Sequence, residues 1–494
     1  MNKKDISDIR DTIEFLKQEG ELLTIKEPVD PIYETAGIQV ALDNGPAFLF
    51  ENIKGYPEAR SIGNVFSRMG RIAKLFGVVD SKQLKFKCLD ALKHPIPPVV
   101  VDKAPCQEVV ITFDVDINNT LPVLKTTERD GARVMGSGMV LFSEKYGRGG
   151  YEISFKRMNF RGYRGRDWAS LTASPGTHGE TILFKDYRNE DVPVTINICA
   201  SPAVMLIAGA GLVHSIIPLG TDELAIAGGL EGSPIEICKA KTVDACSIAK
   251  AEWVIEGVIT TERVWETEEA EKLGKANVAP FFPEWVGYLG RAWRSRKFQV
   301  TALTHRKDPI YYNWLADSYD GTQVGIPFRE ACFYEIAERL VPGLVIDVHI
   351  PFALRLAGGV IYQVKKKRPA DEGFQRNIIA HALSAQPGMK LVIAVDEDVD
   401  IYNMDDVLWA IMTRANPTTD YLVGTSGARG IQAGGAPGGL AIDATVPFNE
   451  RAQFERSHYP VDKIDLKKWL SEAEINAIKG QQSEYARCLA QRGW

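Results

Sequence analysis

The sequence predicts a mixed α/β (α+β) protein of several domains, and three features of the chain support this. Helix and strand signals alternate in the first hundred residues, short strands dominate from about 118 to 325, and helices then alternate with compact apolar runs. The 494 residues are 45% hydrophobic and 25% charged, an ordinary globular composition for two or three domains. We expect an N-terminal α/β domain over 1–117, a β-rich domain over 118–325 and a C-terminal α/β domain over 326–494.

The N-terminal block opens with a helix followed by a strand. Apolar residues recur at three- and four-residue steps before a glycine, in the order Ile6, Ile9, Ile13, Leu16 and Gly20. This spacing predicts an amphipathic helix that ends at the glycine. We expect a strand over 22–25, and the proline-rich stretch 94–98 places a first boundary near 100–118.

The middle block contains strands, and the last block alternates helices with strands. Apolar and polar residues alternate over 192–198 and, less regularly, over 298–303, which predicts two strands. After that, a helix is expected over 329–341, and the apolar runs 344–348 and 391–395 read as buried strands. A helical tail is expected over 464–492, with Ser471 and Glu474 in capping-box register; it would pack on the body or on a second subunit.

Two charged runs follow predicted strands. Asp396 to Asp400 contains four acids and lies beyond the run 391–395, where ligands gather in open α/β sheets. The alternative is a solvated acidic loop that caps the next helix, and we assign no metal to this run. The basic run Lys365 to Arg368 is interpreted as a solvated strand end.

Charge and composition exclude several classes of function. Lys and Arg total 58 and Asp and Glu 64, so the net charge of 58 − 64 = −6 does not favour nucleic-acid binding. No stretch reaches the ~18 apolar residues of a membrane-spanning helix. Seven scattered cysteines without a C-x-x-C pair indicate a reduced, cytoplasmic protein with neither a disulfide framework nor a zinc site.

Common motifs for nucleotides and hydrolysis do not occur. The glycine-rich segment 424–439 has no Walker lysine, and no G-x-G-x-x-G follows a strand. H-E-x-x-H and G-x-S-x-G are also missing. A flavin or nucleotide would therefore need another kind of cradle, and hydrolase chemistry has little support.

One short segment places several polar side chains together. Strand periodicity over 151–157 puts Glu152, Ser154 and Lys156 on one face and Arg157 on the other. His178 and Glu223 follow in turn-like contexts. Glu152, His178 and Glu223 carry suitable donors for Mn²⁺ or Mg²⁺ if the fold brings them together, whereas taken singly they are ordinary strand and turn residues.

Glu284 lies in the apolar stretch 280–288, which contains Pro, Phe, Trp and Tyr. Burial among these neighbours would suit the carboxyl group to proton transfer. The alternative is an acid at a turn with its carboxylate in water.

Taken in order, several segments resemble the UbiD family of decarboxylases that use prenylated FMN. The resemblance covers nearly the whole chain. The segments that carry it are 63–71, 153–157, 218–223 with 227–229, 283–288, 300–310, 395–400, 406–414 and 443–445.

The resemblance implies a central flavin-binding split β-barrel and a C-terminal oligomerisation domain with a tail helix. It implies that prenylated FMN is held with Mn²⁺ (or Mg²⁺) and with K⁺ nearby, and that Glu152, His178 and Glu223 bind the divalent metal. It also implies Arg157 and Glu284 as catalytic residues. The cofactor-binding residues it implies are Glu152, Ser154, Arg157, His178, Pro218 and Glu223.

This chain departs from the family pattern at two positions. Many members carry a further carboxylate five residues before the catalytic acid, where this chain has Ala279. Either another acid substitutes, with candidates upstream at Glu266, Glu268, Glu269 and Glu271, or the set of carboxylates is reduced. Glu152 stands where the family commonly has Asn, and the extra negative charge bears on which ion is preferred.

The expected function is reversible, non-oxidative decarboxylation of an aromatic or heteroaromatic carboxylic acid. It would proceed through a covalent adduct with prenylated FMN, with Glu284 as proton donor and Arg157 positioning substrate and cofactor. Expected partners are the acid, CO₂, a flavin prenyltransferase that supplies the cofactor and further copies of the chain in a dimer or hexamer, with no nucleic acid and no membrane. Substrate-pocket residues are expected after Arg306 and in 424–440. The alternatives are a non-catalytic subunit of a larger carboxylase or decarboxylase complex and a flavin-binding scaffold.

Overall fold

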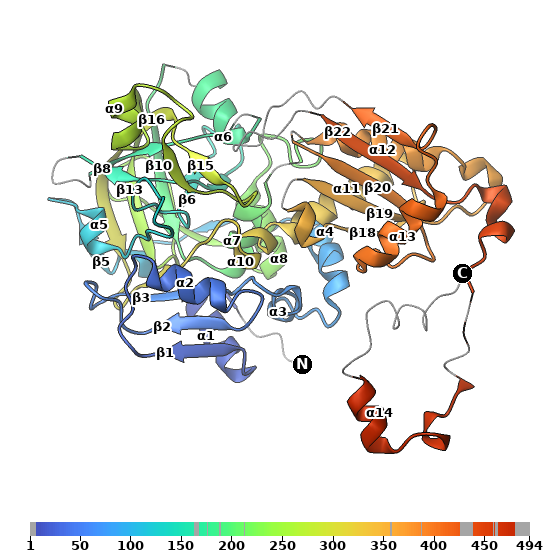
Figure 1. Ribbon diagram of the computed structural model, residues 1–494. Helices are drawn as coiled ribbons and strands as arrows, with labels where there is room; N and C mark the ends of the chain where they lie inside the picture. The colour runs from blue at the N-terminus through green and yellow to red at the C-terminus, as the bar shows by residue number, and fades with distance from the viewer. Residues whose placement is uncertain are drawn as a thin grey trace. The chain divides into compact units, whose positions relative to one another are not determined.

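The computed structural model describes residues 6–162, 167–174, 176–186, 189–211, 213–355, 358–386, 388–424, 438–457, 459 and 463–479. These residues form two compact units that divide between Ala331 and Cys332 (Figure 1). Both units contain helices and sheets, so the predicted mixed α/β class is confirmed. The domain limits at 117 and 325 remain a prediction.

The first unit begins with the predicted helix and strand. α1 (Ile9–Gln18) is capped by Asp8, whose side chain accepts a hydrogen bond from the Asp11 N–H, and it buries Ile9, Ile13 and Leu16. β1 (Leu22–Ile25) pairs with β2 (Ala47–Phe50), which pairs with β3 (Arg60–Gly63). The fourth strand of this sheet is β17 (Ile310–Tyr312), from far along the chain. Helices in this region are α2 (Glu34–Ala41), α3 (Met69–Leu75) and α4 (Leu84–Lys93).

The centre of the first unit is an eight-stranded antiparallel sheet. Seven of its strands follow the order β7 (Glu152–Phe155), β6 (Met139–Phe142), β10 (Val192–Ile198), β13 (Trp253–Trp265), β16 (Arg294–His305), β9 (Trp168–Leu171) and β8 (Phe160–Arg161). The eighth, β5 (Val109–Ile111), also pairs with β16. The smaller strands of the unit are β4 (Val99–Val100), β11 (Glu236–Lys239), β12 (Cys246–Ile248), β14 (Pro280–Pro283) and β15 (Leu289–Arg291). Its other helices are α5 (Ile117–Thr120), α6 (His178–Glu180), α7 (Pro202–Gly209), α8 (Glu223–Glu231), α9 (Glu268–Leu273) and α10 (Tyr319–Gln323).

β10 confirms the predicted strand, but both of its faces are covered. The polar residues Thr195 and Asn197 are as buried as the valines and isoleucines around them. Thr195 donates to the Cys246 carbonyl at 2.6 Å, and Asn197 accepts from the Ile248 N–H at 2.8 Å. The polar side chains of β10 therefore form hydrogen bonds with the backbone of β12 instead of with water.

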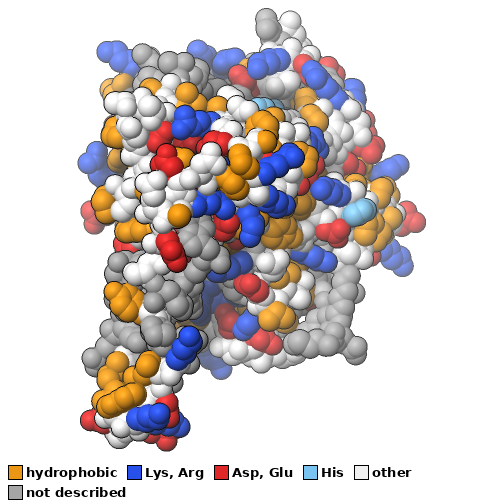
Figure 2. Space-filling model, turned by 90° about the vertical axis from the view of Figure 1, so that its right-hand side faces the viewer, with side chains coloured by type: hydrophobic (Ala, Val, Ile, Leu, Met, Phe, Trp, Pro, Cys, Tyr) orange, Lys and Arg blue, Asp and Glu red, His pale blue; other side chains and the backbone are white. Residues whose placement is uncertain are grey.

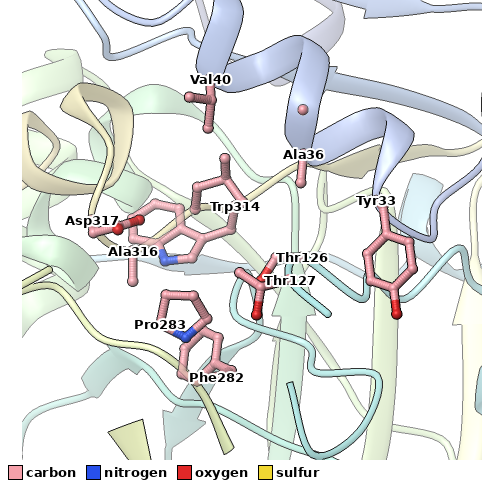
Figure 3. A pocket seen from close by; sticks show the side chains of 12 residues that line it. Tyr33, Ala36, Val40, Thr126, Thr127, Phe282, Pro283, Trp314, Ala316 and Asp317 are labelled. Atoms are coloured by element: carbon pink, nitrogen blue, oxygen red, sulfur yellow. The ribbon is translucent and has the colours of Figure 1, made fainter. Parts of the chain in front are cut away.

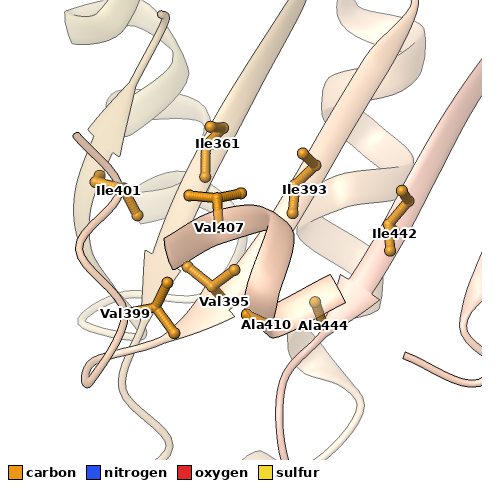
Figure 4. Packing of buried hydrophobic residues seen from close by; sticks show 9 residues of the cluster. All are labelled: Ile361, Ile393, Val395, Val399, Ile401, Val407, Ala410, Ile442 and Ala444. Carbon is orange, nitrogen blue, oxygen red and sulfur yellow. The ribbon is translucent and has the colours of Figure 1, made fainter. Parts of the chain in front are cut away.

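The second unit is a five-stranded mixed sheet in the order β18 (Val345–His349), β19 (Gly359–Val364), β20 (Leu391–Asp396), β22 (Gly439–Ala444) and β21 (Tyr421–Gly424). The central strands β19, β20 and β22 are parallel. α13 (Met404–Arg414) packs Val407 and Ala410 on the isoleucines of these strands (Figure 4). On the other face lie α11 (Ile326–Leu340), which spans the boundary between the units, and α12 (Phe374–Ala385). The predicted helix and both strands of this block are confirmed.

The charged runs beside these strands are exposed to solvent only in part. Asp396 and Asp398 are buried and both accept from Arg414, at 3.1 and 2.6 Å. Lys366 is also buried and donates to Glu372 and to the Val446 carbonyl. The interpretation of a solvated loop is therefore wrong for Asp396 and Asp398, and that of a solvated strand end is wrong for Lys366, because charged partners from other segments neutralise them inside the unit. The other three residues of the basic run, Lys365, Lys367 and Arg368, are exposed as predicted.

The tail prediction is tested only in part. α14 (Glu472–Lys479) begins with the predicted capping box, in which Ser471 and Glu474 exchange side-chain-to-backbone hydrogen bonds. Residues 480–494 and the glycine-rich 425–437 lie outside the described residues. No helix in the described part of the chain combines the length and apolar character needed to cross a membrane. On the face drawn in Figure 2, acidic and basic side chains are interspersed.

Candidate active site

β7 positions the first group of predicted site residues. Glu152 and Ser154 point to the same side, and the Ser154 hydroxyl donates to Glu152 Oε1 at 2.8 Å. Lys156 Nζ donates to the Ser154 hydroxyl at 2.5 Å, so the side chains of Lys156, Ser154 and Glu152 are joined by two successive hydrogen bonds. Arg157 contacts a different set of groups, as the strand periodicity predicted.

The fold brings His178 and Glu223 to this strand. Glu223 is the first residue of α8, and its Oε2 accepts from the Ile153 N–H at 2.8 Å. His178 begins α6, and its Nδ1 lies 3.7 Å from Glu223 Oε1. The His214 ring stands edge-on to His178 with 4.7 Å between the centroids. Glu152, His178 and Glu223 are each only 2% exposed, so the set is nearly closed to water.

Burial dominates the electrostatics of this cluster. It raises the pKa of Glu152 to about 7, against the opposing charge of Lys156, and raises the pKa of Glu223 to about 8. Burial also lowers the pKa of Lys156 and of His178. A low pKa keeps the imidazole neutral, which is the form that binds metal ions.

The donor atoms fit a divalent cation. Glu152 Oε2 and His178 Nε2 are buried and have no hydrogen-bond partner among the described residues. Two carboxylates and a neutral imidazole form a donor set for Mn²⁺ or Mg²⁺. Within the described residues, however, no three His, Cys, Asp or Glu side chains already stand in a metal-binding arrangement.

Glu284 lies directly after β14 and is held inside the protein. Its carboxylate accepts a hydrogen bond from Arg157 Nη1, and only 4% of the residue is exposed. Its backbone N–H donates to the Tyr288 carbonyl at 2.9 Å. Gly290 leaves room for the side chain, because a Cβ there would lie 2.7 Å from Glu284 Cγ. The alternative of a water-exposed turn carboxylate is wrong.

The structure identifies Glu266 as the second carboxylate on Arg157. Glu266 accepts from Arg157 Nε at 3.1 Å and from Nη2 at 3.0 Å. It was one of four upstream acids that the sequence left open, and nothing local to it distinguishes it from Glu268, Glu269 or Glu271. Ala279 instead packs in an apolar cluster with Phe281 and Phe282.

Pro218 lies in an exposed turn before α8, and its carbonyl accepts from the Thr221 N–H at 3.0 Å. It has no side-chain polar group, so any part it takes in binding a cofactor would involve the backbone or packing. Its predicted role stays a prediction.

A cavity of about 310 Å³ opens beside β14 (Figure 3). Phe282, Pro283 and Trp314 give it apolar walls, and Gly37 of α2 also lines it. Trp314 also stacks on Phe155 of β7, with 4.3 Å between ring centroids. The segment 314–317 lines the cavity and lies after Arg306, where pocket residues were expected; most of the other expected segment, 424–440, lies outside the described residues.

Comparison with known proteins places the chain in a family. Three domain models match it: the N-terminal, Rift-related and C-terminal domains of 3-octaprenyl-4-hydroxybenzoate carboxy-lyase, over residues 13–87, 99–318 and 322–434. A gallate decarboxylase of Lactiplantibacillus plantarum is 31% identical over 480 residues, 90% of this chain and 94% of the relative. The chain therefore belongs to the UbiD family. It is a carboxy-lyase of that family, as the resemblance implied.

Solved structures agree with this assignment. The UbiD-class enzyme HmfF of Pelotomaculum thermopropionicum, in an evolved dimeric form in complex with prFMN, superposes with a TM-score of 0.79 at 28% identity and covers 94% of this chain and 100% of its own. Apo 3,4-dihydroxybenzoic acid decarboxylase of Klebsiella pneumoniae gives a TM-score of 0.79 at 30% identity, covering 94% and 99%. The likeness extends over both units of this chain.

Proposed function

We propose that this chain catalyses reversible, non-oxidative decarboxylation of an aromatic or heteroaromatic carboxylic acid with prenylated FMN. The observation that carries the proposal is the buried contact between Arg157 and Glu284, beside a cluster of Glu152, His178 and Glu223 whose donor atoms fit a divalent ion. The names of the relatives, which act on gallate and 3,4-dihydroxybenzoic acid, support an aromatic acid as substrate.

Arg157 positions the acid. Of its five N–H donors, two bond Glu266, one bonds Glu284 and one reaches the Arg291 carbonyl at 3.3 Å. One Nη1 hydrogen has no partner among the described residues. A substrate carboxylate would accept from it and so lie beside Glu284.

Glu284 supplies the proton. In the decarboxylation direction the bond between the ring carbon and the carboxylate breaks and CO₂ leaves. Glu284, after taking up one proton from solvent, transfers that proton to the ring carbon and is left again as a carboxylate. Prenylated FMN, when bound, supplies the electron sink for the pair left on the substrate. Its phosphate would be held with Mn²⁺ (or Mg²⁺) by Glu152, His178 and Glu223, with Ser154, Arg157 and Pro218 as further contacts and K⁺ nearby. A flavin prenyltransferase would supply the cofactor, and the active form would be a homo-oligomer.

The cavity beside β14 is suited to the aromatic part of the substrate. Its volume is near the lower end of the ~300–1,000 Å³ typical of small-molecule pockets, and Phe282, Pro283 and Trp314 give it apolar walls. Pro283 connects the cavity directly to Glu284 along the chain.

The test is a panel of aryl and heteroaryl acids incubated with protein co-produced with a flavin prenyltransferase. We expect CO₂ and the decarboxylated arene from at least one acid, and no turnover from protein loaded with unmodified FMN. Cofactor binding without CO₂ release from any acid would instead favour a scaffold or a non-catalytic subunit. Equal turnover with unmodified FMN would contradict the cofactor assignment.

A further inference from the structure

Lys156 carries a buried amino group that the proposed reaction does not use. Only 8% of the residue is exposed, and within the described part of the chain its Nζ forms one hydrogen bond, to the Ser154 hydroxyl. An ammonium group has three donors, so two of them have no partner among these residues. None of the described carboxylates forms an ion pair with Nζ either. Because buried charges in proteins are normally paired, Lys156 is suited to receive an anion.

The end of the Lys156 side chain lies at the proposed metal cluster. The Ser154 hydroxyl accepts from Lys156 and donates to Glu152 Oε1, so a single hydroxyl separates the amino group from that carboxylate. A Cβ added at Gly179, the residue after His178, would lie 3.7 Å from Lys156 Nζ. Lys156 therefore reaches both the strand that carries Glu152 and the short helix that begins at His178.

The charges of the cluster do not balance a phosphate unless a further cation takes part. Glu152 and Glu223, ionised as metal ligands, carry two negative charges that one divalent ion cancels, and His178 binds a metal as the neutral imidazole. A phosphate monoester carries about −1.5 to −2 charges near pH 7. These three residues are buried, so little water is present to screen that charge. Lys156 supplies a positive charge at this place.

We propose that Lys156 donates to the phosphate of the flavin cofactor and binds it together with the divalent ion. The inference rests on the proposed function, which assigns that phosphate to Glu152, His178 and Glu223. It gives the two cations different roles. The ion joins the phosphate to the carboxylates, and Lys156 balances the charge that remains on the phosphate.

The test compares the dissociation constants of FMN and of riboflavin, the same flavin without its phosphate, on protein loaded with Mn²⁺. Lys156→Met keeps a long side chain and removes the charge. Loss of a hydrogen bond to a charged group lowers affinity ~10–100-fold, and we expect this loss for FMN, with riboflavin affinity within twofold of wild type. Quenching of flavin fluorescence measures both constants. Lys185→Met is the control, because its side chain is 60% exposed and already pairs with Glu180; it should bind both flavins as wild type does.

Mn²⁺ binding in the absence of any flavin separates a lost phosphate contact from a collapsed site. A nearby ammonium group repels a metal ion, so Lys156→Met should bind Mn²⁺ at least as tightly as wild type. His178→Ala should bind it more weakly, because that change removes a proposed ligand. Thermal unfolding shows whether each variant is folded, and Lys156→Gln takes the place of the methionine variant if the latter does not fold.

Equal losses of affinity for FMN and riboflavin in Lys156→Met would overturn the proposal, because the effect would then not involve the phosphate. So would an unchanged FMN affinity, a wild type that binds FMN no more tightly than riboflavin, or a fall in Mn²⁺ affinity as large as that in His178→Ala. None of these measurements needs turnover. If wild type converts no acid while Lys156→Met loses only FMN affinity, the proposed decarboxylation fails and the assignment of Lys156 stands.

Discussion

Arg157 donates from Nη1 to the carboxylate of Glu284, although 127 positions separate the two residues in the chain. Both side chains are buried; Arg157 lies two residues after β7, and Glu284 directly follows β14. In the proposed reaction, this contact sets where the substrate carboxylate and the transferred proton lie relative to each other.

His178→Ala should release the divalent ion and, with it, the flavin. His178 is one of three proposed ligands. Mutation of a residue that only hydrogen-bonds to a metal ligand typically lowers metal affinity 10–100-fold. Because this change removes a ligand itself, we expect the metal affinity to fall at least about tenfold. Metal analysis and flavin absorbance on the purified protein measure this. His94→Ala is the matched control because its side chain is 75% exposed. Unchanged metal and flavin content in His178→Ala would leave His178 an ordinary buried histidine.

Gly37→Leu should fill part of the cavity beside β14 and weaken substrate binding. A Cβ at Gly37 meets nothing within 4 Å, and leucine favours the helix, so α2 should stay folded. We expect KM to rise about tenfold while kcat changes little, since the lost contact is made equally before and during reaction. Gly70→Leu in α3 is the control, because Gly70 is equally open but lies outside the cavity. An unchanged KM in Gly37→Leu would exclude the cavity as the substrate pocket.

Asp320 should make stability depend on pH. Burial raises its pKa to about 7, although the Phe66 N–H and the Tyr312 hydroxyl donate to it. In the unfolded chain the pKa of this group is about 4. Below that pH, the raised pKa contributes its full stabilisation of the folded state, and this contribution is lost as the pH rises through about 7.

The Asp320→Asn variant stays neutral throughout this range. Relative to wild type it should therefore gain stability between pH 5 and pH 8, by on the order of 2 kcal/mol. Thermal unfolding at the two pH values measures this, with the exposed Glu14→Gln as control. The same difference from wild type at both pH values would show that Asp320 does not titrate in this window.

Much of the fold was predictable because local spacing encodes it. The three-and-four spacing of Ile9, Ile13 and Leu16 predicted α1, and the alternation over 192–198 predicted β10. The partner of a strand is not encoded locally, however. β17 completes the N-terminal sheet from 250 residues away, and Asp396 is buried because Arg414 reaches it from the next helix.

The part of the candidate site whose residues are neighbours in the sequence was predictable. The alternation over 152–157 placed Glu152 and Ser154 together and Arg157 apart, and the structure agrees. His178 and Glu223 were suggested by residue type and family resemblance, and only the fold brings them within 3.7 Å. Glu266 was not distinguishable from its acidic neighbours, because its hydrogen bonds from the Thr172 hydroxyl and the Trp293 N–H join residues 94 and 27 positions apart.

The central claim is that Glu284 transfers the proton, and Glu284→Gln tests it most directly. Gln keeps an oxygen to accept from Arg157 but cannot exchange a proton, so fold and flavin content should survive. The measurement is decarboxylation together with exchange of the product's ring hydrogen for solvent deuterium, on fully cofactor-loaded protein, with the exposed Glu269→Gln as control. General acid catalysis contributes ~10²–10⁴-fold, and both rates should fall on that scale in Glu284→Gln alone. Near-normal rates of both reactions in Glu284→Gln would contradict the account.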